Sequence, residues 1–452
     1  MTVMIKNHLK QVLLISITML VCACKAMGPD YVRPNTQTPA AFKEAAADKP
    51  LGKLDVKWWA IYGDAELGQL ISRVALQNYS LQAAAAKSQK ARALTEVAQA
   101  AKLPSVMFQP LPGRRNDLGV MARWEIDLWG RIQRNIEASG ASAQASAADM
   151  AAMQLSLQAQ LAQNYFNLRV QDDQIRLLQE AAIVQVHLLT VTQNQYAVGV
   201  ADRSSVLQAE TQLNVVQSQV HQAKVSRAQL EHAIAVLIGK APADFSIAAA
   251  NVVNSLPEVP LAVPAELLLR RPDIASAERK LAGASAKIGE AEASAYPTLS
   301  LFAGVSIRSG LLGGPSVSLP IYSGGSNKAR NSEAKLAYQV ELANYQQTVL
   351  EAFREVEDNL ASLQSLGNAE INQAQAVKTA RASLAILNNQ QQVGIINYPA
   401  LRSAQTAVLD NEKARLDTLG QRLVASVNLI KALGGGWQPS ELDAYATPVE
   451  KK

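Results

Sequence analysis

The chain reads Tyr196-Ala-Val-Gly199, Val206-Leu-Gln-Ala-Glu210 and Leu237-Ile-Gly239, and the same order returns as Gln391-Gln-Val-Gly394, Leu401-Arg-Ser-Ala-Gln405 and Ala432-Leu-Gly434. The first glycines of the two copies lie 195 positions apart, and so do the last, so about forty residues align without a gap. Upstream, Leu103-Pro104 and Tyr296-Pro297 match at a spacing of 193. A duplication of this size predicts two copies of one structural unit, with function in what the copies enclose.

Each copy also contains a long stretch without proline, at 131–196 and at 326–393. A helix of about 65 residues would span about 100 Å, more than an ordinary globular domain accommodates. Around Gly199, apolar residues recur at coiled-coil spacing: Leu161, Tyr165, Leu168, Ile175, Ala182, Val186 and Leu189 before it, and Val206, Ala209, Leu213, Val216, Val220, Ala223, Leu230, Ile234 and Leu237 after it. The pattern predicts a long antiparallel coiled-coil hairpin in each copy, turning at Gly199 and at Gly394.

Before each long helix we expect a shorter helix and a β-hairpin. The first short helix is predicted from about Ala65 to Lys102. Residues 118–128 and 298–308 alternate strictly between an apolar face and a charged or small face, as strands of membrane β-barrels do, and the alternation continues through Val317, Leu319 and Ile321. The β-hairpins are therefore expected at about 105–128 and 298–322, the second turning at about 309–314. Four strands are too few to close a barrel, whereas three chains would supply twelve.

The first 24 residues have the pattern of a bacterial signal peptide. Basic residues precede an apolar run that is too short to span a bilayer, and the run ends at Cys22-Ala-Cys24. A small residue directly before cysteine predicts lipidation of Cys24, with palmitate as an expected acyl chain, and this would fix the N-terminus at a bilayer. The expected divisions are the signal peptide (1–23), an extended arm (24–60), the first repeat (61–242), a linker (243–264), the second repeat (265–437) and a tail (438–452).

The composition argues against several classes of function. The net charge of +5 comes from dispersed Lys and Arg, so no nucleic-acid surface is expected. Four His and two Cys give no basis for a metal site, a cofactor or a cysteine nucleophile. The glycine run 434–436 follows a helix rather than a strand, so it indicates a helix end and not a phosphate loop. We therefore expect that the chain is not an enzyme.

The chain resembles the lipoprotein branch of the outer membrane factors, the TolC-like channels of tripartite efflux. The motifs that carry the resemblance are Gly28-Pro-Asp-Tyr-Val-Arg-Pro34, Trp58-Trp59, Gly63-Asp64, Trp124-Glu-Ile-Asp-Leu-Trp-Gly130, Leu268-Leu-Arg-Arg-Pro-Asp-Ile274 and Ala432-Leu-Gly-Gly-Gly-Trp437. The resemblance implies a mainly α-helical homotrimer, anchored by lipid in the outer membrane, with a twelve-stranded β-barrel continued by an α-helical periplasmic tunnel. It also implies docking onto a periplasmic adaptor and an inner-membrane pump, and passive export of drugs or other small solutes.

The chain departs from the family's pattern at the expected periplasmic aperture. Where the family carries aspartates after the second turn glycine, this chain has Ala400 and Ser403, and the equivalents in the first copy are Ser205 and Gln208. Rings of carboxylates would bind cations and hold an entrance shut, so this chain should lack that lock. Asp202, Arg203 and Arg402 lie nearby as candidates for replacement salt links, or as ordinary solvated turn charges.

The short β-hairpins are a second departure. Only 25 residues separate Pro104 from Gly130, and the first strand, expected from Ser105 to Pro112, contains Pro110 and Pro112. A membrane strand needs about 9 to 11 residues and tolerates proline poorly. Either the barrel is minimal, or the chain is a deletion-bearing, poorly conducting member of the family. A further alternative is a periplasmic adaptor, which also carries a coiled-coil hairpin, but an adaptor would have one hairpin flanked by many strands.

Overall fold

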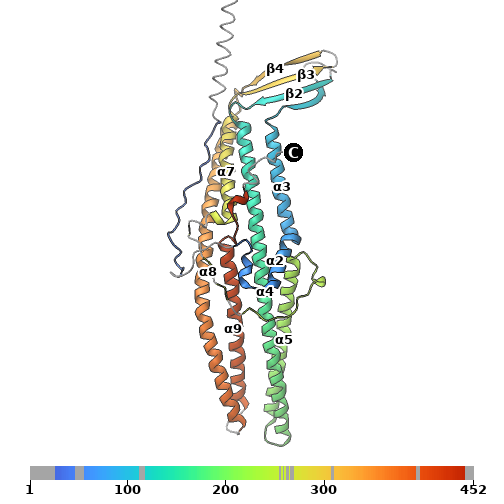
Figure 1. The fold of residues 1–452 in the computed structure, drawn as a ribbon, viewed down its shortest axis with the longest axis vertical. Coiled ribbons are helices and arrows are strands. Elements are labelled where there is room, and N and C mark those ends of the chain that lie inside the picture. The colour runs from blue at the N-terminus through green and yellow to red at the C-terminus, as the bar shows by residue number, and fades with distance from the viewer. Residues whose placement is uncertain are drawn as a thin grey trace, which may run out of the picture.

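The computed structural model describes residues 26–45, 55–110, 118–253, 256–257, 259–260, 264, 269–306, 310–392 and 398–442. The predicted signal peptide, Cys24 and Gly394 lie outside this described part. Figure 1 shows an elongated helical molecule with a small sheet at one end. No helix in the described ranges combines the length and the hydropathy needed to cross a membrane.

The long helices confirm the duplication, residue for residue. Helices α4 (Arg131–Ala197) and α8 (Ser326–Gln392) each have 67 residues, and their partners α5 (Arg203–Leu237) and α9 (Tyr398–Ala432) each have 35. At 1.5 Å per residue, α4 and α8 each extend about 100 Å. They therefore run through most of the molecule, and each pairs with its shorter antiparallel partner in the half away from the sheet (Figure 1).

Most of the predicted coiled-coil residues are buried, but Val186 is 48% exposed. The prediction was wrong there because α4 packs against α9 as well as α5. Its buried side consequently turns to Gln185 and Leu188, which are 5% and 8% exposed. The coiled-coil spacing describes a helix that packs against one partner helix, whereas α4 packs against two.

The short helices correct another expectation. The helix predicted from Ala65 to Lys102 is two helices, α2 (Ala65–Gln77) and α3 (Tyr79–Ala100), which are broken at Asn78. The counterpart of α3 in the second copy is α7 (Pro272–Ala293). Within the described ranges, the 3-10 segments are η1 (Trp58–Tyr62), η2 (Pro242–Asp244) and η3 (Pro439–Leu442).

The break at Asn78 belongs to a joint that both copies share. The Asn78 side chain accepts from the backbone N–H of Leu81 at 3.0 Å and donates to the carbonyl of Leu237, the last residue of α5, at 2.9 Å. At the matching position, 193 residues on, Arg271 precedes α7 and donates to the carbonyl of Ala432, the last residue of α9, at 3.2 Å. Each joint therefore satisfies a carbonyl that a helix end leaves without a partner.

Replacing Asn78 with Ala should lower the free energy of unfolding by about 1 to 3 kcal/mol, because it removes a helix cap and leaves a buried carbonyl unpaired. Thermal unfolding followed by circular dichroism would measure the loss. The matched control is Asn359→Ala, since Asn359 only bonds the carbonyl of Glu355 within its own helix. Equal losses in the two variants would contradict the proposed joint.

The four strands form one antiparallel sheet in sequence order: β1 (Ser105–Pro110), β2 (Leu118–Ile126), β3 (Thr298–Ser306) and β4 (Gly310–Ser318). Both predicted hairpins are present, with corrected bounds. Strand β4 begins at Gly310 and ends at Ser318, so the expected turn at 309–314 lies mostly in the strand, and Leu319 and Ile321 lie beyond it. Pairing of Leu311, Gly313 and Pro315 with β3 extends the strand through residues whose glycine content suggested a turn.

The main core lies at mid-height, where the two hairpins meet η1 and α2. Trp58, Ile71, Phe166 and Ile234 are fully buried there, and the Tyr62 ring packs on Phe166 at 4.8 Å between centroids. Nearer the sheet, alanines on α4 and α7 make the contact instead. Gly283 on α7 lies close enough that an added Cβ would sit 3.4 Å from the carbonyl oxygen of Ala138. Small residues thus allow close helix packing.

Candidate functional site

The sheet presents a continuous apolar face that no other described element covers. Cross-strand pairs place Phe108 beside Val120, Val120 beside Val305, and Val305 beside Leu311. These side chains are exposed, by 65% at Phe108, 57% at Val305 and 82% at Leu311. Water would disfavour such a patch, whereas a lipid bilayer would favour it.

The opposite face of the sheet carries polar, small and charged residues as well as Met121 and Phe302. Arg123 lies opposite Phe302, and Glu125 lies opposite Ser300. Met121 and Ser300 are only 8% and 6% exposed, so this face is the more enclosed of the two. One apolar face and one mixed, partly charged face agree with the alternation in the sequence.

Within the described residues, strands β1 and β4 are the two ends of the sheet and pair on one side only. Strand β1 has six residues, whereas β2, β3 and β4 have nine each. Three strands therefore approach the length that a membrane strand needs, and β1 is the short one. An edge of unpaired N–H and C=O groups in lipid would be strongly unfavourable, so this sheet requires a partner strand at each side.

Tryptophans attach the sheet to the helices. The indole N–H of Trp124 donates to the carbonyl of Lys102 at 2.9 Å, and that of Trp129 donates to the carbonyl of Pro297 at 2.8 Å. The Trp129 ring also packs on Tyr296 at 4.8 Å between centroids. Large aromatic side chains with one polar atom suit the boundary between an apolar and a wet environment. The sheet is thereby fixed to the ends of α3 and α7.

The N-terminal arm packs along the helices below the sheet. Arg134 on α4 donates to the carbonyl of Met27 at 3.0 Å and pairs with Asp30 at 2.8 Å. Further along, Tyr31 donates to Glu278 at 2.7 Å. Burial and that hydrogen bond to a carboxylate raise the pKa of Tyr31. These contacts tie the segment that follows Cys24 to α4 and α7.

Polar side chains join α4 to α9 at regular intervals. Gln163 bonds Asn428 at 2.6 Å, Gln174 bonds Asp417 at 2.5 Å, and Gln185 bonds Gln405 at 3.3 Å. The three glutamines are 11 residues apart, and an 11-residue repeat keeps one face of a nearly straight helix toward its neighbour. The contacts between the two hairpins are therefore made mostly by amides, with one carboxylate, that of Asp417.

A buried ionic network lies at mid-height in the first copy. Asp172 accepts from Arg169 at 3.0 Å, from Arg227 at 2.6 Å and from the backbone N–H of Ala250 at 3.2 Å. Arg169, 1% exposed, also donates to Glu66 and to the carbonyl of Ala248. The network fastens the linker after η2 across α4 and α5. The sequence around Asp172 does not predict this network, because Arg227 and Ala250 are distant from it along the chain.

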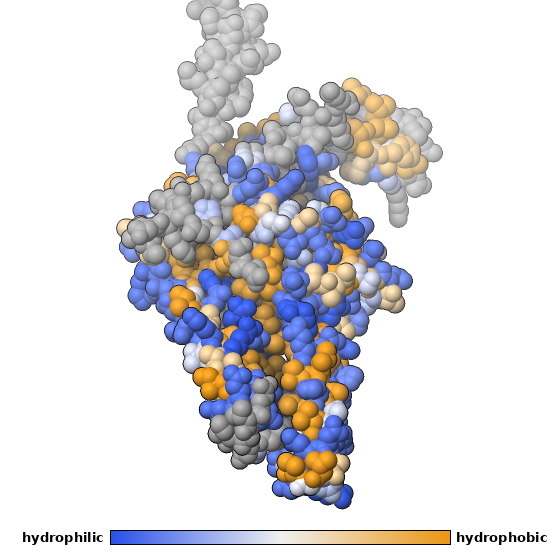
Figure 2. Space-filling view, turned by 60° about the horizontal axis from the view of Figure 1, so that its bottom comes forward, coloured by the Kyte–Doolittle hydropathy of each residue, from blue (hydrophilic) through white to orange (hydrophobic). Residues whose placement is uncertain are grey.

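The first hairpin turn has the predicted glycine conformation. Gly199 has φ of 76°, and an added Cβ would meet nothing within 4 Å. Asp202 caps α5 by accepting from the backbone N–H of Ser205 at 2.7 Å, and this bond lowers the pKa of Asp202. Val198 and Val200, on either side of the glycine, are 74% and 77% exposed. Figure 2 shows apolar residues at this end of the molecule.

The other predicted aperture residues lie on the same ends of the hairpins. Arg203 and Gln208 are exposed on α5, and Ser205 is partly buried there. On α9, Arg402 and Ser403 are exposed, whereas Ala400 is partly buried. Among the described residues, the structure gives Asp202, Arg203 and Arg402 no ion pair. Within the described part of one chain, the suggested replacement salt links are therefore not made, and the capping role of Asp202 accounts for its position.

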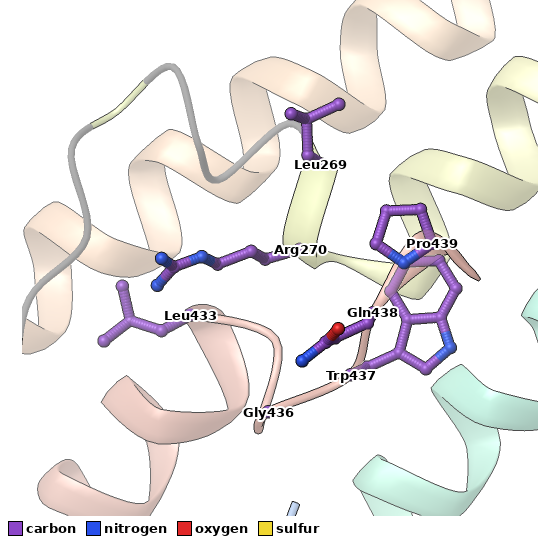
Figure 3. A pocket seen from close by; sticks show the side chains of 7 residues that line it. All are labelled: Leu269, Arg270, Leu433, Gly436, Trp437, Gln438 and Pro439. Carbon is purple, nitrogen blue, oxygen red and sulfur yellow. The ribbon is translucent and has the colours of Figure 1, made fainter. Parts of the chain in front are cut away.

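The Arg270-Arg271-Pro272-Asp273 segment has the local role that its residues indicate. Pro272 is the first residue of α7, Asp273 lies in its first turn, and Arg271 pairs with Asp273 at 2.6 Å and with Glu355 at 2.7 Å. Next to it is a cavity of about 170 Å³. Figure 3 shows the Arg270 side chain extended away from Trp437 at this cavity. In the described ranges no group of three His, Cys, Asp or Glu is placed to hold a metal ion.

An apolar-faced sheet that continues into helices about 100 Å long defines a membrane channel with a helical extension. Comparison with known proteins identifies the family within this class. The model of the outer membrane efflux protein family matches residues 70–240 and 263–435. The chain belongs to the outer membrane efflux protein family. It is a channel of the outer membrane that serves as an exit duct for efflux.

Individual relatives are similar over nearly their full length. The chain is 28% identical to the cation efflux system protein CusC of Escherichia coli, over 91% of this chain and 96% of that protein. It is 25% identical to the probable outer membrane lipoprotein SilC of Salmonella typhimurium, over 94% and 99%. The outer-membrane channel OprN has a TM-score of 0.85 at 28% identity and covers 91% of this chain and 99% of its own. The Campylobacter jejuni CmeC channel, with a TM-score of 0.85 at 21% identity, shows the same fold.

The family match overturns the adaptor alternative, and the fold agrees. The described chain has two long hairpins and one four-stranded sheet, whereas an adaptor was expected to have one hairpin among many strands.

Proposed function

We propose that three copies of this chain close one channel, with a barrel of twelve strands that continues into a helical tunnel. The observation that carries this proposal is the four-stranded sheet, whose apolar face is exposed and whose β1 and β4 edges have no partner strand among the described residues. Pairing β4 of one copy with β1 of the next would satisfy both edges and leave the apolar faces toward lipid. The helices of the three copies would then surround a common tunnel.

We further propose that Cys24 carries the lipid anchor, with palmitate among its acyl chains. The arm that follows it is held on α4 and α7 through Met27, Asp30 and Tyr31. A single acyl chain attaches a protein to a bilayer only weakly. Several acyl chains on Cys24, together with the proposed barrel, would attach this chain firmly. Mass spectrometry of the mature N-terminus would test this, with Cys24→Ala as the variant that should lose the modification.

The partners we propose are a periplasmic adaptor and an inner-membrane pump, which would deliver solutes to the hairpin ends. Exposed Val198 and Val200 support end-on docking of a protein, since small apolar side chains at a tip are costly in water. The contacts between α4 and α9 are mostly amides with one carboxylate, Asp417, and this low density of charge supports passive conduction of varied small solutes. We assign the chain no catalytic activity.

Reconstitution tests the channel. Purified protein in detergent should have the mass of three chains by light scattering, and in planar bilayers it should give stable open-channel currents. A trimer without currents would favour the deletion-bearing, poorly conducting alternative that the short β1 raises. A monomer would contradict the proposed closure altogether.

We expect little block of this channel by divalent cations added at the periplasmic side, because Ala400 and Ser403 bring no carboxylates to the aperture. The double variant Ala400→Asp/Ser403→Asp should gain concentration-dependent block by Co²⁺, since each copy would then add two carboxylates to a ring. Ala400→Asn/Ser403→Asn is the uncharged control and should behave like the unmodified chain. Strong block of the unmodified channel would overturn the assignment of these positions.

A further inference from the structure

The face of the sheet opposite the apolar one carries two charged residues among the described strand positions, Arg123 and Glu125, both on β2. The strand register places Arg123 opposite Ser105 on β1 and Phe302 on β3. Glu125 is already neutralised, because both of its carboxylate oxygens accept from the guanidinium of Arg131, at 2.8 and 3.0 Å. Arg123 therefore carries the charge that the described strands leave unbalanced.

No carboxylate close by compensates Arg123. Its side chain is exposed, and within the described ranges its guanidinium makes no hydrogen bond and no ion pair. The next carboxylate along the chain on this side is that of Asp127, which follows the end of β2 and accepts from the backbone N–H of Gln133 at 2.7 Å. Four residues of extended chain separate the two charges by about 13 Å. Exposed charges are largely screened beyond about 8 Å at physiological salt, so Asp127 does not balance Arg123.

Closing the proposed barrel would bring no carboxylate to Arg123 from a neighbouring copy. The strands that would meet between copies carry uncharged residues on this face, at every second position from Leu312 to Ser318 on β4 and from Ser105 to Gln109 on β1. Each copy would therefore contribute one guanidinium without a counter-charge. By symmetry, the three groups would lie at the same depth in the barrel.

We propose that Arg123 determines the charge preference of the duct: the three guanidinium groups form a ring inside the barrel that attracts small anions and repels cations. This inference rests on the proposed three-copy barrel and adds the class of solute that its membrane part favours. Fixed charges of one sign along a water-filled pore raise the local concentration of ions of the opposite sign. Solutes with a net negative charge are then enriched at this level of the channel.

The dimensions of a twelve-stranded barrel set the size of the effect. Strands about 4.8 Å apart and tilted by about 40° enclose a barrel with a radius of about 12 Å. Arginines that point inward from such a wall lie within about 10 Å of an ion on the axis. At about 0.1 M salt, where charges are screened over about 10 Å, the ring should change the ratio of chloride to potassium permeability by about fourfold. At about 1 M salt the screening length is about 3 Å, so this contribution should largely vanish.

Zero-current potentials in planar bilayers with a KCl gradient measure the preference on the complete protein. At about 0.1 M salt, Arg123→Gln should lower the chloride-to-potassium permeability ratio by about fourfold, and Arg123→Glu should lower it further. Arg123→Lys keeps the charge and should keep the ratio. Lys43→Gln is the matched control, because it removes a positive charge from the N-terminal arm, where the Lys43 side chain is 86% exposed. This control should leave the ratio unchanged.

Light scattering tests the assembly of each variant separately from its selectivity. Conducting trimers whose permeability ratio is the same in Arg123→Gln, Arg123→Lys and the unmodified chain would overturn the role of Arg123 and leave the proposed channel standing. The comparison of these two variants suffices even where Arg123→Glu does not assemble. An effect of Arg123→Gln that is equal at about 0.1 M and about 1 M salt would also contradict a screened ring of charge. A monomer, or a trimer without currents, would overturn the proposed conducting channel and the role of Arg123 with it.

Discussion

Replacing Asp172 with Ala should lower the stability of the folded chain by about 3 to 5 kcal/mol, the range for breaking a buried ionic group by removing one member. The Asp172 side chain is 4% exposed and joins Arg169 and Arg227. Its removal would leave two arginines with one fewer counter-charge in a site from which water is largely excluded. It would also free the backbone N–H of Ala250, which now bonds Asp172.

The loss of stability in the Asp172→Ala variant should be greatest in one segment of the chain. The linker from Ile247 to Val252 is held by Arg227, Glu231, Asp172 and Asp173. Limited proteolysis should therefore cut this segment faster in the variant, while thermal unfolding followed by circular dichroism measures the stability. Arg354→Ala is the control, since its partners Glu351 and Asp358 are exposed and such pairs contribute little. A linker that resists protease equally in both variants would contradict the role given to the network.

Replacing Gly434 with Ala should lower the free energy of unfolding by about 2 to 5 kcal/mol, because two penalties combine. Gly434 has φ of 91°, a region that costs a residue with a side chain about 1 to 2 kcal/mol. In addition, an added Cβ would lie 2.1 Å from the carbonyl oxygen of Arg270, so the backbone of the joint would have to move. Overpacking of this kind costs about 1 to 3 kcal/mol more.

The chain supplies matched positions for this experiment. Gly239 is the equivalent in the first copy, with φ of 69° and a Cβ position 2.3 Å from the carbonyl oxygen of Gln77, so Gly239→Ala should cost about as much. Gly199 has φ of 76° but open space around it, so Gly199→Ala should show only the conformational cost of about 1 to 2 kcal/mol. Thermal unfolding of the three variants would separate the two penalties. Similar losses of stability at all three positions would show that the close approach of Gly434 to the carbonyl of Arg270, and of Gly239 to that of Gln77, does not matter.

The fold was predicted from local sequence patterns, and the predictions were correct for features that nearby residues determine. The absence of proline and the 195-residue offset predicted the bounds of the long helices to within a few residues. Alternation predicted the apolar face of the sheet. The errors occurred where a distant partner decides: Asn78 ends a helix because the carbonyl of Leu237 lies beside it, and the sequence around Asn78 alone does not show this.

The candidate site divides in the same way. Gly199 was predicted from its place in the repeat, and its positive φ agrees. Asp202 was considered for a salt link, whereas its carboxylate caps α5. The cavity between the hairpins was not predicted, because all four of their helices must come together to form it.

The sequence by itself determined the duplication, the length of the hairpins, the two-faced strands and the family resemblance, because each is written in spacing along the chain. Only the tertiary structure decided the helix break at Asn78, the ionic network around Asp172, the glycine contacts at the joints and the cavity between the hairpins. Those features depend on pairs such as Asn78 and Leu237, which bond at 2.9 Å across 159 residues. Hydrogen bonds and close packing act over a few ångströms in space, whatever the separation in sequence.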